Sequence, residues 1–324
     1  MFNALRTKFS AIAIRQDNVR ITIQGINVKL LLADIGDTWG TSVLATYMFD
    51  AVRTHSVGVP HFFAPDFMYM LNTLMSTDRI RSPKRAIKKL ILELERNTWL
   101  GDIGATRKAS ITDLNATRGM FPFSNKDYQD KYIEHYGLTV PTFNLKGYLL
   151  DAGAGTGKTA TGLMLGKALG ADKVIVISPL PAVDRVWRHT IEDLMLEDHT
   201  AWVSNGKGQE LTKDFKYYIV HYEALGNFTQ FVKSNLTAFE NSYIILDESH
   251  NFNDPDSQRT AALVELCKLR QVRNINFASA TPIMALGYEC IPFLKCVDPL
   301  FNDNIEVRFK KIYGRNAKRA NDIL

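Results

Sequence analysis

The residues from Ala152 to Thr159 have the composition of a loop that binds a phosphate group. They follow an apolar run at 147–151 and precede a helical pattern at 159–169. Small residues allow backbone N–H groups to surround a β-phosphate, and the N-terminus of the helix adds positive potential. A lysine can reach the β and γ oxygens, and a threonine hydroxyl can bind Mg²⁺. We predict that ATP is bound by Ala152, Gly153, Ala154, Gly155, Thr156, Gly157, Lys158 and Thr159.

An apolar run at 243–246 ends in two carboxylates and a histidine, Asp247, Glu248 and His250. Asp247 can hold Mg²⁺ beside the phosphate loop, so the predicted magnesium ligands are Thr159 and Asp247. Glu248 can position and deprotonate an attacking water. We expect the strand before Asp247 to adjoin the strand before the phosphate loop. The predicted catalytic residues are Lys158, Asp247, Glu248 and His250.

Together these segments resemble motifs I and II of the first RecA-like lobe of superfamily two helicases and translocases, which read A-x-x-G-x-G-K-T and D-E-x-H. A third match, Ser279-Ala280-Thr281, follows an apolar run at 275–278. In this superfamily the corresponding segment couples nucleotide state to strand binding. The resemblance implies an ATP hydrolase that moves on nucleic acid, with ATP and Mg²⁺ as its cofactors.

Gln129 resembles the glutamine that reads adenine in the same superfamily. A glutamine amide can pair with both N6 and N7 of adenine. Phe121, Phe123 or Tyr128 could stack on the base. A surface glutamine beside core aromatics is an equally good interpretation, so both stay open.

Several segments between about 121 and 300 are similar to the Swi/Snf group of double-stranded DNA translocases. They include 174–179 followed by Trp187, the run at 220–225, and the residues from Thr281 to Pro299. The phosphate loop and the third motif depart from the usual Swi/Snf patterns, so phage, restriction-enzyme and recombination motors are alternatives. The resemblance implies sequence-independent binding of double-stranded DNA. The coupling and nucleic-acid contacts it implies are Ser178, Pro179, Tyr222, Ser279 and Thr281.

The apolar runs at 148–150, 174–177, 217–220, 243–246 and 275–278 are apolar on both faces, which is typical of parallel strands covered by helices. Helical patterns separate them at 159–169, 183–196 and 259–270, the last with Ser257 as a possible cap. We predict an α/β fold, a RecA-like parallel sheet with helices on both faces, preceded by a smaller α+β accessory domain. The predicted domains are an accessory domain at 1–115, an ATP-binding lobe at 116–300 and a linker at 301–324.

The accessory domain has a different pattern. Residues 19–32 alternate like a strand or hairpin, whereas 42–52 and 67–75 look helical. A further helix begins at Ser82 and has an apolar face opposite Lys84, Arg85, Lys88 and Lys89. Residues 1–120 carry 16 Lys and Arg against 10 Asp and Glu. This basic surface is typical of an ordinary solvated face and is also compatible with a nucleic-acid contact.

Composition excludes other classes of protein. The 324 residues are 46% hydrophobic and 23% charged, which excludes disordered and collagen-like chains. No uncharged apolar stretch approaches the roughly 18 residues needed to cross a bilayer, so we expect no membrane partner. Three cysteines without paired spacing predict buried thiols in a reducing, intracellular compartment, the cytoplasm or nucleus, or the host cytoplasm for a viral protein.

A complete motor of this kind has a second RecA-like lobe that supplies arginines to the γ-phosphate. About 24 residues follow Pro299, so we expect an N-terminal part of a longer helicase, or a second lobe supplied in cis or in trans. The isolated chain should then hydrolyse ATP slowly. Two other classes stay open: a small-molecule kinase or ring-forming ATPase, and a non-catalytic nucleic-acid-binding or regulatory module that keeps an ATP-binding scaffold.

Overall fold

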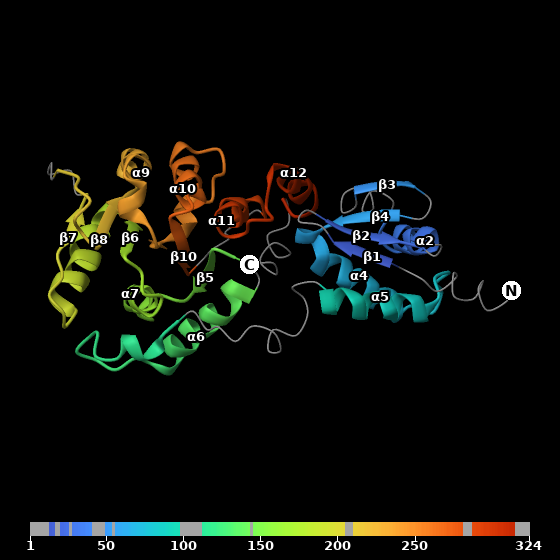
Figure 1. Ribbon diagram of the computed structural model, residues 1–324, viewed down its shortest axis with the longest axis horizontal. Coiled ribbons are helices and arrows are strands. Elements are labelled where there is room, and N and C mark those ends of the chain that lie inside the picture. Colours follow the sequence, from blue (N-terminus) through green and yellow to red (C-terminus); the bar gives the residue numbers. More distant parts are fainter. Residues whose placement is uncertain are drawn as a thin grey trace. The chain divides into compact units, whose positions relative to one another are not determined.

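The computed structural model describes residues 13–16, 20–25, 28–40, 49–53, 56–97, 112–142, 145–204, 210–280 and 287–314. The chain forms two compact units (Figure 1). The first consists of Met1–Arg107 and Leu300–Ile312, and the second of Lys108–Pro299 and Tyr313–Leu324. The functional division into accessory domain, ATP-binding lobe and linker stays a prediction.

The second unit contains a parallel sheet of six strands in the order β5-β10-β9-β6-β8-β7. All five predicted strands are present, which confirms the predicted fold class. The sixth, β7, is a three-residue edge strand that the sequence analysis did not predict. The strands are β5 (Gly147–Asp151), β6 (Lys173–Ser178), β7 (Ala201–Val203), β8 (Tyr217–His221), β9 (Ser242–Leu246) and β10 (Val272–Ser279).

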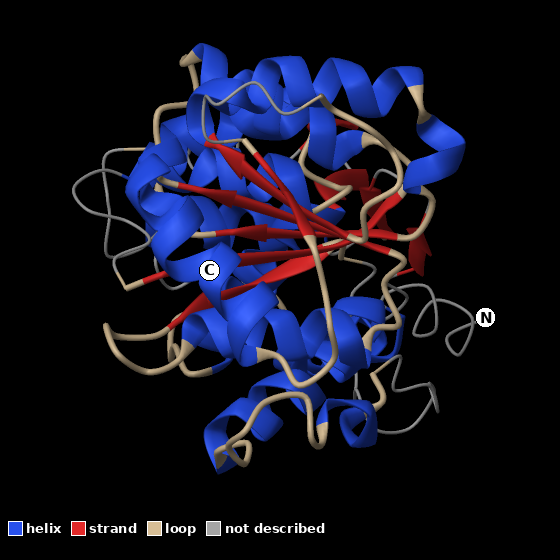
Figure 2. Ribbon diagram, turned by 90° about the vertical axis from the view of Figure 1, so that its left-hand side faces the viewer, coloured by secondary structure: helices blue, strands red, loops and turns tan. Residues whose placement is uncertain are grey.

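Helices lie on both sides of this sheet (Figure 2). The α-helices of the unit are α6 (Asp127–Thr142), α7 (Lys158–Ala168), α8 (Leu180–Ala182), α9 (Leu225–Ser234), α10 (Gln258–Lys268) and α11 (Ile291–Val297). The short 3₁₀ turns are η2 (Leu114–Thr117), η5 (Tyr222–Ala224), η6 (Leu236–Phe239), η7 (Ser249–Phe252) and η8 (Gly287–Cys290). The helix predicted at 183–196 is wound instead as two π-helical segments, η3 (Val183–Arg188) and η4 (Thr190–Leu194).

Alternate residues of each central strand enter two separate hydrophobic cores. In β6, Val174 and Val176 pack with α6, α7 and the π-helical segments, whereas Ile175 and Ile177 pack with α9, α10 and α11. This two-residue period follows from the pleat of a strand, and both faces are apolar because helices cover both. The helix α10 begins as predicted, because the Ser257 hydroxyl accepts a hydrogen bond from the Thr260 N–H.

The strand order corrects one expectation. β10 lies between β5 and β9 and pairs with both, so the strands that precede the phosphate loop and Asp247 are separated by one strand and do not adjoin. The carboxyl ends of all three still reach the same edge, because the strands are parallel. β10 carries Ser279 to that edge between the two motifs.

The first unit contains a four-stranded antiparallel sheet in the order β1-β2-β4-β3. Its strands are β1 (Ala13–Gln16), β2 (Arg20–Gln24), β3 (Phe49–Arg53) and β4 (Ser56–Pro60). Its helices are α2 (Val28–Trp39), η1 (His61–Phe63), α4 (Ala64–Met75), α5 (Lys84–Asn97) and, from the end of the chain, α12 (Asp303–Ile312). The rings of Phe62, Phe301 and Phe309 pack edge to face, with centroids 5.1 to 6.1 Å apart.

Two predictions for this unit are wrong. The alternating pattern at 19–32 predicts a strand or hairpin, but the strand β2 ends at Gln24. The helix α2 begins at Val28 and buries Val28, Leu31 and Ile35, which share one helical face. Residues 49–52, predicted as part of a helix at 42–52, belong instead to β3, which pairs with β4. The preceding residues 41–48 lie outside the described part. The helices at 67–75 and after Ser82 are confirmed as α4 and α5.

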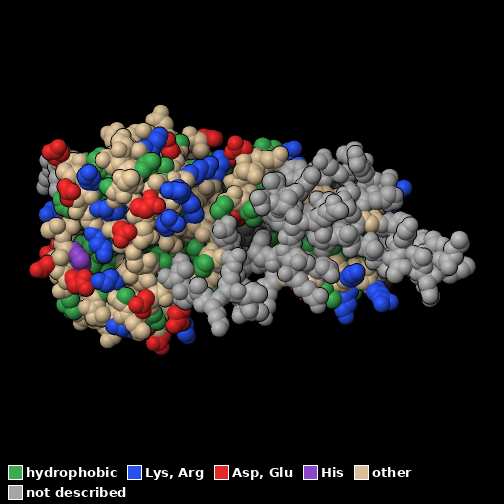
Figure 3. All heavy atoms as spheres, viewed as in Figure 1, with side chains coloured by type: hydrophobic (Ala, Val, Ile, Leu, Met, Phe, Trp, Pro, Cys, Tyr) green, Lys and Arg blue, Asp and Glu red, His purple; other side chains and the backbone are tan. Residues whose placement is uncertain are grey.

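The exposed basic residues of α5 and the buried cysteines agree with the expectations drawn from the sequence. Lys84, Arg85, Lys88 and Lys89 are exposed on α5, and Figure 3 shows basic side chains along that helix, whereas acidic and basic side chains are interspersed over the second unit. The three cysteines are buried free thiols, as predicted. None of the helices in the described ranges is both long and apolar enough to span a membrane.

Gly166 tests how closely α7 approaches the sheet. A Cβ at this position would lie 2.9 Å from Cδ1 of the fully buried Tyr243, so Gly166→Ala should lower the free energy of unfolding by about 1–3 kcal/mol. Gly226→Ala is the control, because a Cβ there would contact nothing within 4 Å. Urea unfolding measures both; a Gly166→Ala protein as stable as the control would contradict the close approach.

Candidate nucleotide site at the carboxyl edge of the sheet

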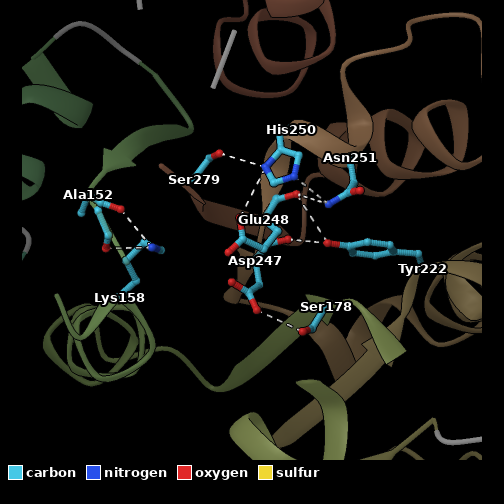
Figure 4. Close-up of polar contacts among 10 residues, drawn as sticks. Ala152, Lys158, Ser178, Tyr222, Asp247, Glu248, His250, Asn251 and Ser279 are labelled. Carbon is cyan, nitrogen blue, oxygen red and sulfur yellow. Dashed lines mark hydrogen bonds and ion pairs between the residues drawn. The ribbon is translucent and has the colours of Figure 1, made fainter. Parts of the chain in front are cut away.

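The predicted motifs meet at the carboxyl edge of the six-stranded sheet. β5 leads into the phosphate loop, β9 leads into Asp247 and Glu248, and β10 ends at Ser279 between them. Figure 4 shows these side chains around one region, with Lys158 on the α7 side and His250 above the carboxylate pair. Parallel sheets bind ligands outside the carboxyl ends of their strands. This edge is therefore the candidate site.

The phosphate loop ends in the uncapped N-terminus of α7. Gly157 occupies the position before the helix with φ of 81°, in the left-handed region that favours glycine, and no side chain caps the helix. The first N–H groups of α7 therefore have no side-chain acceptor and can bind an anion. The Lys158 ammonium donates to the carbonyl oxygens of Ala152 and Gly153, at 2.9 and 3.1 Å.

Gln129 supports the end of this loop from α6. Its side chain is 3% exposed. Its Oε1 accepts from the Lys126 N–H at 2.9 Å, and its Nε2 donates to the Thr161 hydroxyl at 3.1 Å. Thr161 in turn donates to the Gly157 carbonyl at 3.0 Å. The amide thus lies next to the phosphate loop, and its reading of adenine stays a prediction.

The three aromatic residues proposed to stack on adenine differ in exposure. Phe121 is buried, whereas Phe123 is 48% and Tyr128 is 47% exposed. Phe123 stacks on Phe121 with ring centroids 5.0 Å apart. The Tyr128 hydroxyl donates to the Thr156 carbonyl in the phosphate loop at 2.5 Å. Tyr128 is therefore a partly exposed aromatic ring in contact with the loop, whereas Phe123 is partly exposed but stacks on Phe121.

Asp247 is held at one oxygen of its carboxylate. The Ser178 hydroxyl donates to Oδ2 at 3.1 Å, and the Trp187 indole N–H donates to the same atom at 2.8 Å. The Asp247 N–H donates to the Ile177 carbonyl at 2.9 Å. Within the described ranges no donor meets Oδ1. One carboxylate oxygen is thus engaged by the protein, and the other is free to bind a cation.

The backbone at Glu248 is in the left-handed region, with φ of 47° and ψ of 55°. This conformation is uncommon for a residue other than glycine. Two hydrogen bonds hold it: the Tyr222 hydroxyl donates to the Asp247 carbonyl at 2.7 Å, and the Asn251 amide donates to the Glu248 carbonyl at 2.9 Å. Burial, and then the nearby Asp247 charge, raise the pKa of Tyr222 well above its ordinary value, so its proton stays in place.

His250 connects the two later motifs. Its Nδ1 lies 3.2 Å from the Ser279 hydroxyl at the end of β10 and 3.4 Å from Oε2 of Glu248 (Figure 4). A protonated ring would form an ion pair with Glu248, whereas either ring form can share a hydrogen bond with Ser279. The imidazole can thus transmit a shift of the carboxylate to β10.

The residues predicted to contact nucleic acid lie in different settings. Ser178, Tyr222 and Ser279 are buried, and their hydroxyls contact Asp247 or His250. Their buried position favours a role in coupling nucleotide state to nucleic-acid binding over direct contact with a nucleic-acid phosphate. That coupling role stays a prediction. Pro179 is half-buried just after β6. Thr281 lies outside the described residues.

The oxygen atoms of this edge fit magnesium. Mg²⁺ prefers hard oxygen ligands and binds proteins through one or two of them together with substrate phosphates. The Thr159 hydroxyl forms no hydrogen bond with another described residue and stands at the start of α7. Asp247 Oδ1 is similarly available, while Oδ2 is fixed. These are the two ligands that the sequence predicts.

A comparison with protein families matches the part of the chain that carries this site. The family described as "Type III restriction enzyme, res subunit" matches residues 122–284, just over half of the chain. The chain belongs to this family. The match confirms the resemblance to the first RecA-like lobe of superfamily two helicases. Restriction-enzyme motors were one of the alternatives to the Swi/Snf group.

Comparisons with curated proteins and with solved structures give less information than the family match. No curated protein matches this member of the Type III restriction enzyme family. A similar solved structure is the Sulfolobus solfataricus SWI2/SNF2 ATPase core in complex with dsDNA, at 18% identity and a TM-score of 0.48. The match covers 63% of this chain and 43% of the other, so this family member spans less than half of that chain's length.

Sequence reasoning missed two residues of the site in this Type III restriction enzyme family member. Trp187 was only a landmark in a resemblance, and its contact with Asp247 depends on the π-helical winding of η3. Asn251 immediately follows the D-E-S-H run and holds the Glu248 carbonyl. A polar residue directly after the motif was a usable signal, whereas no local pattern indicates a π-helix.

Tyr222 tests the support of the carboxylate pair. Tyr222→Phe removes the hydroxyl that donates to the part-buried Asp247 carbonyl, so the free energy of unfolding should fall by about 1–3 kcal/mol. Tyr217→Phe is the matched control, since Tyr217 is 2% exposed and its hydroxyl bonds to none of the described residues. Denaturant titration compares the two. Equal stability losses would mean that the Tyr222 hydroxyl supports nothing specific.

Proposed function

We propose that this chain is the ATP-binding and ATP-hydrolysing lobe of a motor that moves on nucleic acid. One observation carries the proposal: the phosphate loop and the Asp247-Glu248 pair emerge at the same sheet edge, with β10 between them. Membership of the Type III restriction enzyme family supports it. A kinase or ring-forming ATPase would give no role to the contact between His250 and Ser279.

Each residue has a role that follows from its place. The α7 N-terminus and Lys158 would bind the β and γ phosphates, and Lys158 would leave its loop carbonyls for those oxygens. Glu248 would orient the attacking water and take its proton as the bond to the γ-phosphorus forms. The Tyr222 and Asn251 bonds keep the Glu248 backbone in the conformation that orients its side chain.

Thr159 and Asp247 are the residues that would hold Mg²⁺. The cation, when bound, would neutralise charge on the triphosphate and favour departure of ADP, as the bond between the γ-phosphorus and the β–γ bridging oxygen breaks. Ser178 and Trp187 keep the Asp247 carboxylate in one orientation throughout.

Coupling to nucleic acid would pass through the residues around the carboxylate pair. Ser178 follows β6, Tyr222 follows β8 and Ser279 ends β10, so each links a loop at the sheet edge to Asp247, Glu248 or His250. A change in phosphate occupancy could thereby reach those loops. Double-stranded DNA, bound independently of sequence, is the proposed partner.

The opposing positive charge is proposed to come from a second RecA-like lobe, in cis or in trans. Within the described ranges no arginine forms an ion pair with Asp247 or Glu248. Transition-state charge on the γ-phosphate would then be stabilised from this lobe by Lys158, the α7 N-terminus and the Mg²⁺ that Thr159 and Asp247 would hold.

Steady-state ATP hydrolysis with and without duplex DNA tests the proposal. In a protein that contains both lobes, duplex DNA should stimulate phosphate release, and single-stranded RNA serves as the comparison. ATP turnover that does not respond to nucleic acid, and that transfers the γ-phosphate to a small molecule, would favour a kinase. Nucleic-acid binding without any ATP binding would favour a regulatory module.

Lys158→Ala and Glu248→Gln should separate binding from hydrolysis in the two-lobe protein. Lys158→Ala should weaken ATP binding because the phosphates lose a cation, and Glu248→Gln should keep binding but lower turnover at least about 100-fold. Lys131→Ala, on the exposed side of α6, is the control. Fluorescent-nucleotide titration and phosphate release measure the two steps. Unchanged turnover in either site variant would remove the assignment.

The isolated 324-residue chain should bind Mg-ATP but turn it over slowly, even with DNA, because the arginine that opposes the γ-phosphate is proposed to come from the second lobe. Addition of a second lobe should raise the rate by orders of magnitude. Rapid, DNA-stimulated turnover by the purified monomer would contradict the role given to that lobe.

A further inference from the structure

Trp187 is a buried tryptophan whose polar atom faces the candidate site. The side chain is 1% exposed, and its indole Nε1–H donates to Asp247 Oδ2 at 2.8 Å. The indole ring belongs to the hydrophobic core formed with α6 and α7. Because the ring is buried and its N–H bonds to Asp247, the position of the Asp247 carboxylate is tied to this hydrophobic core.

The two donors to Asp247 converge on a single oxygen. Ser178 and Trp187 both bond to Oδ2, and a carboxylate oxygen has about two lone-pair sites for such bonds. Oδ2 is therefore saturated by the protein. Rotation of the carboxylate would break both part-buried hydrogen bonds, so Oδ1 keeps its position.

The winding of the segment that carries Trp187 also points to the site. Residues Val183–Arg188 and Thr190–Leu194 form π-helical turns in place of the α-helix that the sequence predicts. π-Helical turns are rare and occur frequently at functional sites. A tryptophan used only to fill the core would need no such winding. The winding and the bond to Asp247 occur at the same residue.

We propose that Trp187 is a positioning residue for the magnesium ligand. Its indole N–H and the Ser178 hydroxyl saturate Asp247 Oδ2 and leave Oδ1 for the cation that accompanies the triphosphate. The inference rests on the proposed function, because it assumes that Asp247 binds magnesium. Trp187 itself contacts neither nucleotide nor cation; it acts through Asp247.

Trp187→Phe keeps an aromatic ring and removes the N–H. Loss of a hydrogen bond to a metal ligand typically lowers metal affinity 10-fold to 100-fold. The Mg²⁺ concentration at half-maximal ATP binding should therefore rise about tenfold or more. ATP binding in EDTA should be unchanged, because the phosphate loop does not contact Trp187. Trp202→Phe is the matched control, since the Trp202 indole N–H donates to the Glu210 carbonyl, away from Asp247.

The experiment titrates Mg²⁺ into the full chain with a fluorescent ATP analogue, followed by the anisotropy of the directly excited analogue. A shifted Mg²⁺ midpoint in Trp187→Phe, with wild-type affinity in EDTA and no shift in Trp202→Phe, supports the proposal. A midpoint equal to that of the wild type overturns it, as does an equal shift in both variants.

A second replacement keeps the test decisive if Trp187→Phe does not fold. 3-Benzothienylalanine at position 187 preserves the two-ring shape and replaces the N–H by sulfur. A raised Mg²⁺ midpoint supports the proposal and an unchanged one overturns it. Failure of the proposed function is distinguishable, because wild-type protein would then bind no ATP at any Mg²⁺ concentration. Failure of this inference alone leaves wild-type binding and its Mg²⁺ dependence intact.

Discussion

The close approach of α7 to the sheet is the constraint on which the site depends. Gly162 and Gly166 face Ile245 and Tyr243 of β9, so the helix backbone lies against side chains that a Cβ would displace. The N-terminus of this helix can serve the proposed phosphate site only if it stays close to the strand that presents Asp247. Protein interiors are packed to crystal-like density, so the addition of one methyl group at this contact lowers the stability of the fold. The position of the helix thereby sets where the N-terminus of α7 lies relative to Asp247.

Around this contact, polar side chains hold the backbone and the carboxylate of the acidic pair in place. Ser178, Trp187, Tyr222 and Asn251 each donate to Asp247 or Glu248 from a different element of the second unit. Ser178 and Trp187 donate to the Asp247 carboxylate, and hydrogen bonds to a charged group are stronger than neutral ones. Tyr222 and Asn251 donate to the neutral backbone carbonyls of Asp247 and Glu248. Such a network resists small movements until one member is displaced. A nucleotide that displaces Lys158 from its loop would perturb one side of it only.

Much of the second unit could be predicted from sequence because its rules are local. Runs such as 174–177 are apolar on both faces, and Ser257 and the glycines of the phosphate loop mark helix ends. Strand order could not be predicted in the same way, since β10 enters between β5 and β9 through crossovers that the runs do not encode. The bond from Trp187 to Asp247 joins residues 60 positions apart through a π-helix. In the first unit, residues 28–32 fit either period, and burial of Val28, Leu31 and Ile35 on one side selected the helix.

The aromatic contact of Phe62 with Phe301 and Phe309 makes the first unit discontinuous in sequence. Its sheet is made early in synthesis, but the helix that completes its core is the last described element to leave the ribosome. Until then the buried face of Phe62 has no cover, and burial of a phenylalanine is worth about 1.5–3 kcal/mol. Domains generally fold as units while the chain emerges, with N-terminal ones first. The first unit therefore completes its core only after α12 has been synthesised, although most of its residues precede the second unit in the sequence.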